Sequence, residues 1–253
     1  MSLSAGQVEQ FVTEGFVKLE KAFPVEAGQR CVDELWAATG YDRDDPATWT
    51  EPVVRLGGFV TPPFQEAATT AVLHEAFDQL VGEGGWSPRV GLGSFPLRFP
   101  SPAPPGDDGW HVEGSFLGSR GEYRVNLRSR GRALLMLFLF SDVGPDDAPT
   151  RIRVGSHLDV PPLLEPYGDE GLEWMPLCRE AVPASAHRPV TTATGALGDV
   201  YLCHPFLVHA AQPHRGRTPR FMAQPPLDAT EPLDLRGGQP APVARAVLDG
   251  LHR

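Results

Sequence analysis

The order of apolar and polar residues divides the chain into a helical first part and a strand-rich remainder. Val8, Phe11 and Val12 fall on one face of a short helix that Gly15 can end. FVKLE, at 16–20, alternates apolar and polar residues as a strand does. Two longer segments with helical spacing follow, PVEAGQRCVDELWAAT at 24–39 and FQEAATTAVLHEAFDQLVG at 64–82. We therefore predict that residues 1–82 are mostly helical and pack against the rest of the chain.

Beyond Gly82, glycine and proline become frequent and the apolar runs shorten to strand length. We predict strands at 94–99, 122–128, 133–143, 150–154, 188–194, 199–203, 206–211 and 220–224. Helical patterns return within 158–187, and a last helix is expected at 241–253. Such a series of short strands favours a mainly β fold with flanking helices, a sandwich or barrel whose core spans 90–226.

Composition limits the classes of protein that this chain can represent. Its 253 residues, of which 41% are hydrophobic, suit a single domain covering 1–253. The net charge of −10 disfavours a protein that binds nucleic acid through phosphate contacts. The three cysteines, Cys31, Cys178 and Cys203, form no CxxC pair, which is typical of a reducing compartment rather than of a disulfide scaffold or a zinc site.

The sequence also bears on location. The first residues lack the basic and apolar regions of a signal peptide, and the longest apolar run, ALLMLFLF at 133–140, is far shorter than the roughly 20 residues of a membrane span. We therefore expect a soluble cytoplasmic protein with a small-molecule substrate and with neither a nucleic-acid nor a membrane partner. The oligomeric state stays open.

Two pairs of residues have the spacing of metal ligands. Mononuclear iron(II) sites use two histidines and one carboxylate, which leaves coordination positions open. In a strand, residues i and i+2 point to the same side, so a His-x-Asp/Glu pair can reach one metal. The chain contains His111–Glu113 and His157–Asp159, whereas 8 histidines and 32 acidic residues in 253 give about one such pair by chance. The positions of the two pairs in the chain must therefore show which pair binds a metal.

The first pair has the better position. Five or six predicted strands lie between Glu113 and His209, enough chain to travel around a sandwich and bring His209 back opposite the pair. The second pair lies in VGSHLDVP, where a strand end turns into a helix that Asp159 can cap. We therefore predict a metal site formed by His111, Glu113 and His209.

Arg220 follows His209 by eleven residues. Iron dioxygenases of this type usually take 2-oxoglutarate as co-substrate, and an arginine can hold its distal carboxylate with two hydrogen bonds. If His209 ends one strand and Arg220 opens the next antiparallel strand, both side chains can line one cavity. Arg98, in the strand before the 100–109 loop, is a second candidate for binding the co-substrate. A surface position is the alternative for each arginine.

Several stretches resemble the phytanoyl-CoA dioxygenase family. They are QVEQFVTEGFVKLEKAFP, GWHVEG, DVGPDDAPTRIRVGSH and GDVYLCHPFLVHAAQPHRGRTPR, so the resemblance covers roughly residues 7–226. It implies an iron(II)/2-oxoglutarate oxygenase on a double-stranded β-helix, the cupin-like jelly roll. It also implies that His111, Glu113 and His209 bind the iron and that Arg220 anchors 2-oxoglutarate.

Two positions depart from the family pattern. The carboxylate is Glu113, where the family usually has aspartate, and Val-Gly-Ser-His stands at 154–157 in place of Pro-Gly-Ser-His. Glutamate adds one methylene, so we expect a working site with shifted geometry. The related halogenases replace the carboxylate with a small residue to admit halide, and Glu113 argues against that chemistry.

Other residues near the predicted ligands have open roles. Trp110 and Ser115 flank the first pair and are candidates for substrate contact, with a core position as the alternative for Trp110. A basic segment could hold an anionic substrate or form a solvated strand face or a subunit contact; it comprises Arg120, Arg124, Arg128, Arg130 and Arg132.

The expected activity is hydroxylation of an unactivated C–H bond of a small molecule, with iron(II), 2-oxoglutarate and O2 as cofactor and co-substrates. Two alternatives stay open: a cupin-like metalloenzyme that uses its metal as a Lewis acid, and a non-catalytic binder that senses 2-oxoglutarate or metal. The sequence leaves the substrate undefined, including whether it is a coenzyme A thioester or a free metabolite.

Overall fold

Helices and strands are distributed along the chain as the apolar pattern predicts. In the computed structural model, which describes residues 2–253, the helices are α1 (Ala5–Glu14), α2 (Val25–Thr39), α3 (Pro62–Ala68), α4 (Ala71–Val81), α5 (Pro161–Leu164), α6 (Trp174–Ala184) and α7 (Pro242–Leu251). The strands are β1 (Phe16–Leu19), β2 (Val53–Leu56), β3 (Phe95–Arg98), β4 (Phe116–Leu117), β5 (Tyr123–Val125), β6 (Leu134–Leu139), β7 (Arg151–Arg153), β8 (Leu172–Glu173), β9 (Val190–Thr192), β10 (Val200–Cys203), β11 (His209–Ala210), β12 (Met222–Ala223) and β13 (Pro226–Leu227). Most strands are shorter than predicted, and β2, β4, β8 and β13 were not predicted at all.

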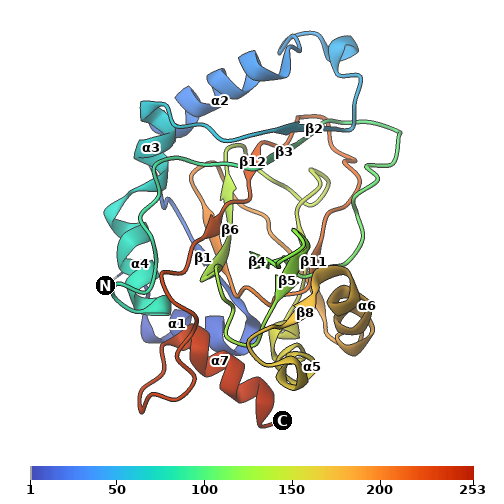
Figure 1. Ribbon diagram of the computed structural model, residues 1–253. Coiled ribbons are helices and arrows are strands. Elements are labelled where there is room, and N and C mark those ends of the chain that lie inside the picture. Colours follow the sequence, from blue (N-terminus) through green and yellow to red (C-terminus); the bar gives the residue numbers. More distant parts are fainter. Residues whose placement is uncertain (1) are drawn as a thin grey trace.

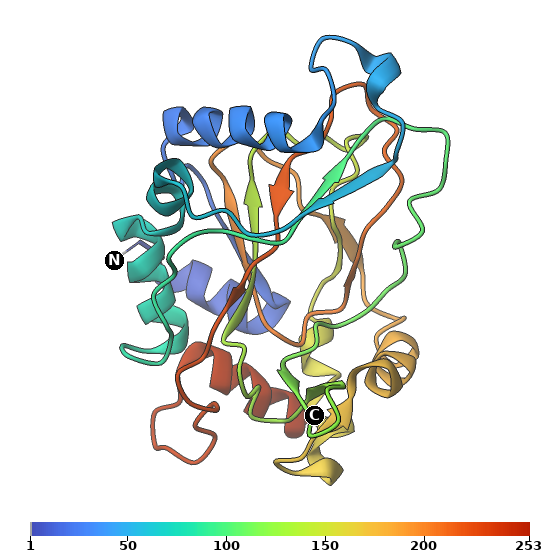
Figure 2. The ribbon, with the colours of Figure 1, turned by 45° about the horizontal axis from the view of Figure 1, so that its top comes forward.

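The larger sheet has the order β1-β10-β6-β12, with β13 also paired to β6. It continues through Arg98 and Arg220, which exchange backbone hydrogen bonds of 3.0 and 2.8 Å. These bonds place β3 beside the segment that enters β12, and β2 pairs with β3 at the edge. The sheet runs down the centre of the molecule in both ribbon views (Figures 1 and 2).

The smaller sheet has the order β11-β7-β9 and is extended by His111, which bridges to His209. From β3 onward the chain passes to the smaller sheet at His111, returns to the larger at β6, continues to β7 and β9 of the smaller sheet, and then alternates through β10, β11 and β12. β4, β5 and β8 leave this path and form a separate three-stranded sheet. A mainly β architecture with flanking helices is therefore confirmed, and this exchange between two sheets is what a jelly-roll path requires.

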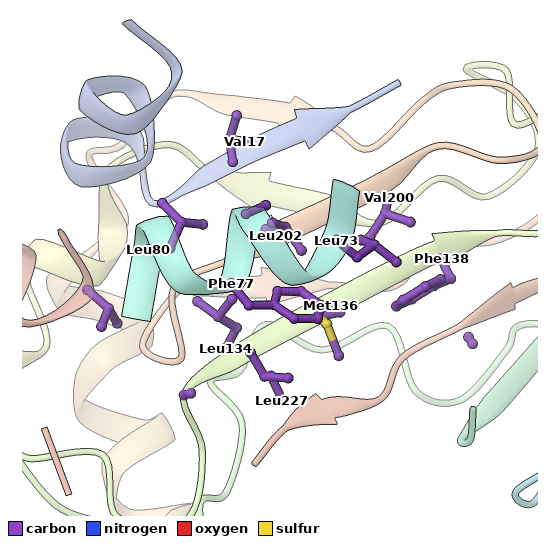
Figure 3. Packing of buried hydrophobic residues seen from close by; sticks show 14 of the residues in the cluster. Val17, Leu73, Phe77, Leu80, Leu134, Met136, Phe138, Val200, Leu202 and Leu227 are labelled. Atoms are coloured by element: carbon purple, nitrogen blue, oxygen red, sulfur yellow. The ribbon is translucent and has the colours of Figure 1, made fainter. Parts of the chain in front are cut away.

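The apolar run of strand β6 is uninterrupted because both faces of the strand are buried. Leu134, Met136 and Phe138 pack into the cluster that includes the helices, whereas Leu135 and Leu137 belong to a second cluster on the opposite face of the sheet. Because successive residues of a strand point to opposite faces, burial on both sides removes the usual alternation. Figure 3 shows α4 lying across β6 and β10, with the Phe77 ring against Met136.

The same alternation separates packing residues from cavity residues at the other edge of the sheet. Phe99 and Phe221 pack against Trp36 of α2, with ring centroids 5.8 and 5.0 Å from the indole. Their sequence neighbours Arg98 and Arg220 point to the other face, into the space between the two sheets.

Helix boundaries follow local capping. Ser4 and Gln7 form a capping box at the start of α1, and Gly15 ends that helix with a φ of 88°. The single helix predicted at 64–82 is wrong, because the chain breaks into α3 and α4. Thr70 causes the break: its hydroxyl accepts from the backbone N–H of Leu73 and donates to the carbonyl of Ala22, which caps a new helix.

The helices predicted elsewhere are present. α5 and α6 fall within 158–187, and α7 accounts for the last helix. Within residues 2–253, none of the helices has both the length and the apolar character that a bilayer span requires.

Candidate metal centre

His111 and His209 are backbone partners in the smaller sheet. Each donates its N–H to the other's carbonyl at 3.0 Å, and the imidazole centroids lie 4.4 Å apart. Glu113, two residues after His111, projects to the same side, with Oε1 3.4 Å from Nε2 of His209 and 3.9 Å from Nε2 of His111. One potential ligand atom from each of the three residues lies within 4.8 Å of the others, so the strands assemble a group that could hold a metal ion.

Backbone carbonyls fix the orientation of both imidazoles. Nδ1 of His111 contacts the carbonyl of Gly109, and Nδ1 of His209 contacts the carbonyl of Leu207, each at 2.9 Å. A carbonyl only accepts, so Nδ1 of each imidazole donates to it, and Nε2 is the nitrogen that faces Glu113. This arrangement is usual for histidines that bind a metal through Nε2.

The charges of the group also suit a divalent cation. Burial opposes ionisation of Glu113, but its contact with His209 and the guanidinium of Arg132, 3.6 Å away, outweigh that effect and lower its pKa to about 2. Burial, helped by the neighbouring His209, lowers the pKa of His111 below its usual 6.5. At neutral pH the group therefore contains an anionic carboxylate and a neutral His111, the forms that bind metals.

A cavity of about 540 Å³ opens beside these residues, and both candidate arginines line it. Arg220 is 1% exposed; it donates to the carbonyls of Ala148 at 2.6 Å and Pro96 at 3.0 Å. Arg98 is 3% exposed and donates through Nη2 to both carboxylate oxygens of Asp107 at 2.9 Å. Arg55 also contacts Asp107.

Some donors of the two buried arginines have no acceptor among residues 2–253. They are Nε and Nη1 of Arg98 and Nε of Arg220. A buried N–H group without a partner costs about 1–3 kcal/mol, so these groups favour a ligand that brings acceptor oxygens into the cavity. A carboxylate meets that need. The ligand atoms of His111, Glu113 and His209 suit an iron(II) ion that keeps open coordination positions.

The expected geometry between His209 and Arg220 is wrong in one respect. β11 pairs with β7 and β12 with β6, so the two residues lie on different sheets rather than on adjacent antiparallel strands. Both still line the one cavity, because the segment between them crosses from one sheet to the other. His214 organises that crossing: its imidazole contacts the carbonyl of Thr218 and accepts from the N–H of Gly216.

The second His-x-Asp pair lies away from this group. His157 is fully buried and contacts the carbonyl of Val12 through Nε2, at 2.9 Å. The expectation that Asp159 caps a helix is wrong, since its carboxylate forms a bidentate ion pair with Arg188 at 2.6 and 2.8 Å.

The two residues that flank the ligand pair differ in position. Trp110 lines the cavity, and the guanidinium carbons of Arg151 and Arg153 lie 4.8 and 4.5 Å from its indole centroid. Ser115 lies outside the cavity wall, and its buried hydroxyl has no hydrogen-bond partner in the described part of the chain.

The arginines of the basic segment mainly have partners within the protein. Arg120 and Arg124 pair with glutamates such as Glu122, and Arg128 donates to the carbonyl of Leu233. Arg130 lies over the ring of Phe116. Arg132 is different: it donates to the carbonyl of Gly114 and lies next to Glu113.

Sequence reasoning missed several residues at the site. For Asp107 the sequence offered one weak indication: it is an acidic residue in the Pro/Gly-rich loop just before the ligand pair. Trp174, Met175 and Cys178 line the cavity from α6, more than sixty residues after His111, and no local pattern connects them to it.

Comparisons with known proteins agree with this arrangement. The sequence matches the family model for phytanoyl-CoA dioxygenase (PhyH) over residues 13–222. No curated protein sequence gives a significant match. These two results come from comparing sequences; the next come from comparing the fold with solved structures.

Similar folds occur among solved structures. HygX from Streptomyces hygroscopicus, solved with nickel and 2-oxoglutarate bound, is 18% identical over 88% of this chain and 85% of its own, with a TM-score of 0.58. SnoK, a non-haem alpha-ketoglutarate-dependent carbocyclase from nogalamycin biosynthesis, is 16% identical over 94% and 92%, with a TM-score of 0.53. SnoN, an alpha-ketoglutarate-dependent epimerase of the same biosynthesis, is 15% identical over 87% and 79%, with a TM-score of 0.52. At such identities the similarity concerns the fold.

Proposed function

Because this chain belongs to the phytanoyl-CoA dioxygenase family, we propose that it is an iron(II)- and 2-oxoglutarate-dependent dioxygenase that hydroxylates an unactivated C–H bond of a small molecule. His111, Glu113 and His209 would hold the iron. Arg220 and Arg98 would hold the distal carboxylate of 2-oxoglutarate. On this proposal residues 1–253 form one oxygenase domain, and the exchange of strands between its two sheets is a double-stranded β-helix.

One observation supports the proposal most strongly: buried guanidinium donors without acceptors share a cavity with the His–Glu–His group. A metal alone would leave these donors unsatisfied. A ligand with a metal-binding end and a carboxylate at its other end would satisfy both parts of the cavity. 2-Oxoglutarate has that form.

The bound iron would supply the oxidising chemistry, in which O2 converts 2-oxoglutarate to succinate and CO2 and one oxygen atom enters a C–H bond of the substrate. The residues of the chain have the other tasks. The carbonyls of Gly109 and Leu207 hold the two imidazoles in the Nδ1–H form, with Nε2 free for the metal. Arg132 keeps Glu113 ionised, and three protein ligands leave coordination positions for 2-oxoglutarate and O2.

The similar structures include an epimerase and a carbocyclase, so the fold is compatible with several outcomes of C–H oxidation. We favour hydroxylation as the simplest of these outcomes. A metal acting only as a Lewis acid would give no role to the unsatisfied donors of Arg98 and Arg220.

The decisive experiment measures 2-oxoglutarate binding and turnover by the purified protein. With iron(II) and ascorbate, we expect a visible charge-transfer band on anaerobic addition of 2-oxoglutarate, and succinate formation in air. His209→Ala should abolish both, while the exposed His187→Ala should retain them.

Variants of Arg220 and Arg217 distinguish the proposed dioxygenase from a Lewis-acid metalloenzyme and from a sensor. Arg220→Gln should weaken 2-oxoglutarate binding at least about tenfold, and the exposed Arg217→Gln should leave it unchanged. Metal binding without any 2-oxoglutarate binding or turnover would refute the proposal. Full activity of Arg220→Gln on another substrate would favour a Lewis-acid metalloenzyme, and 2-oxoglutarate binding without succinate under a broad substrate screen would favour a sensor.

A further inference from the structure

The cavity beside the candidate metal centre is charged at one end and apolar at the other. Of the residues that line it, the charged ones are Arg55, Arg98, Asp107 and Arg220. All four belong to β2, β3, the loop after β3 or the segment entering β12. In Figure 1 β2 and β3 lie at the top and α6 at the lower right, and Figure 2 keeps these elements apart.

The opposite end is formed by the first turn of α6. Trp174, Met175 and Cys178, which we name the α6 wall, all line the cavity. None of the three carries a charge at neutral pH, and burial raises the pKa of the Cys178 thiol further. Met175 is 54% exposed, and it lies where the apolar end of the cavity opens to solvent.

The α6 wall is fixed to the segment that carries the metal ligands. The indole N–H of Trp174 and the thiol of Cys178 both point to the carbonyl of Val112, the residue between His111 and Glu113. The Trp174 ring also meets the His111 ring edge to face, with centroids 6.4 Å apart. A molecule resting on this wall would therefore lie beside the metal ligands.

The carboxylates near the cavity are already paired. Asp107 is held by Arg98 and Arg55, and Glu113 contacts His209 and Arg132. Among the described residues that line the cavity or form the metal group, no carboxylate is left free to pair with a cation on the α6 wall. The arginines that line the cavity belong to its opposite end, and Arg151 and Arg153, which lie over Trp110, already donate to the carbonyls of Ala211 and Val182. An unpaired charge that loses water against apolar side chains is strongly disfavoured.

We infer that the α6 wall binds the part of the substrate that carries the reacting C–H bond, and that this part is uncharged and apolar, either alkyl or aromatic. The inference rests on the proposed function. It divides the cavity between the dicarboxylate co-substrate at the arginine end and the substrate at the α6 end. Met175, at the exposed edge of the wall, selects against charged substrates.

The test compares three probes with one skeleton: 1-naphthalenemethanol (neutral), 1-naphthylmethylammonium (cationic) and 1-naphthoate (anionic). Binding to the purified 253-residue protein is measured by calorimetry with nickel(II) and 2-oxoglutarate present, so that both charged parts of the cavity are filled. We expect the neutral probe to bind at least about tenfold more tightly than either charged probe.

Variants at Met175 locate the binding. Met175→Glu and Met175→Lys should each weaken the neutral probe about tenfold, while Met175→Leu should retain its affinity. Binding of nickel(II) and 2-oxoglutarate by the parent protein is measured separately, so that a failure of the proposed function is distinguished from a failure of this inference. The inference is overturned if the neutral probe does not bind, if a charged probe binds equally well, or if Met175→Glu leaves the neutral probe unaffected.

Discussion

Arg98 and Arg220 are backbone partners on neighbouring strands, yet only Arg98 has a carboxylate. Arg98 holds both oxygens of Asp107, whereas the guanidinium of Arg220 donates only to the carbonyls of Ala148 and Pro96. Two buried cations therefore share one anion, and burial together with the charge of Arg98 lowers the pKa of Arg220. The cavity is left with an excess of positive charge that suits a dicarboxylate.

Asp107→Asn should strengthen 2-oxoglutarate binding, because Asp107 competes with the ligand for Arg98. We expect a KM for 2-oxoglutarate about fivefold lower, equivalent to about 1 kcal/mol. The free energy of unfolding without ligand should fall by about 1–3 kcal/mol, since two buried cations lose their counter-ion. Steady-state kinetics and denaturant titration measure the two effects. The neighbouring Asp108→Asn should change neither, and a weaker 2-oxoglutarate affinity in Asp107→Asn would contradict this account of the pair.

Arg132→Met should weaken metal binding while leaving the fold intact. Arg132 helps to keep Glu113 ionised and bonds to the carbonyl of Gly114, so its loss leaves the carboxylate less well oriented. Residues that support a metal ligand in this way typically contribute 10- to 100-fold in affinity. Competition titration with a metal-binding dye measures the change. Arg130→Met is the matched control, since Arg130 lies over Phe116, and equal affinities of the two variants would remove the role given to Arg132.

Metal affinity should depend on pH through His111 and not through the carboxylate. Glu113, with a pKa of about 2, stays ionised throughout the accessible range. Burial lowers the pKa of His111 below 6.5, so protonation of His111 competes with the metal only below that value. We expect zinc affinity to be nearly constant from about pH 8 to 6.5 and to fall under more acidic conditions. An affinity that falls steeply between pH 8 and 7 would show that a group of higher pKa controls binding.

His157 and His204 should make the fold sensitive to acid. Both are fully buried, with centroids 4.9 Å apart; burial lowers the pKa of His157 to about 4 and that of His204 well below 6.5. The unfolded chain therefore binds more protons than the folded chain below pH 6.5, and the stability present above that pH is lost as the pH falls. At pH 5 the expected loss is about 2 kcal/mol for His157 alone.

His157→Gln tests this sensitivity, because the amide can still donate to the carbonyl of Val12 but cannot titrate. Its free energy of unfolding, measured with urea at several pH values, should fall less between pH 7 and 5 than that of the parent chain. The exposed His187→Gln should retain the parent profile. Parallel profiles for the parent and His157→Gln would contradict the prediction.

Some parts of this structure could be read from the sequence, and others depend on distant contacts. Periodicity located most elements, since alternation and helical spacing are local properties of the chain. The group of His111, Glu113 and His209 was predicted from spacing and chain length, and these residues do lie together. Periodicity does not specify which sheet a strand joins, so the positions of β11 and β12 on different sheets were missed.

The unpredicted contacts share one physical reason. Thr70 begins a new helix partly because its hydroxyl reaches the carbonyl of Ala22, and the α6 wall reaches the site because Trp174 bonds to the carbonyl of Val112. Arg132 likewise reaches Glu113 although β4 and β5 lie between them in the sequence. Each is a contact between residues distant in sequence that forms only in the folded chain, so the neighbouring sequence does not predict it.

Strand β6 gives the molecule two compartments that can change independently. Its even-numbered residues, such as Met136, contact the helices, and its odd-numbered residues, such as Leu137, face the space between the sheets. A substitution at an even position alters the attachment of the helices, whereas one at an odd position alters the interior that adjoins the ligand strands. Adjacent residues of one short strand thus affect different properties of the protein. During evolution, substitutions at odd positions could adapt the interior to a new substrate, while the packing of the helices at even positions maintains the stability of the fold.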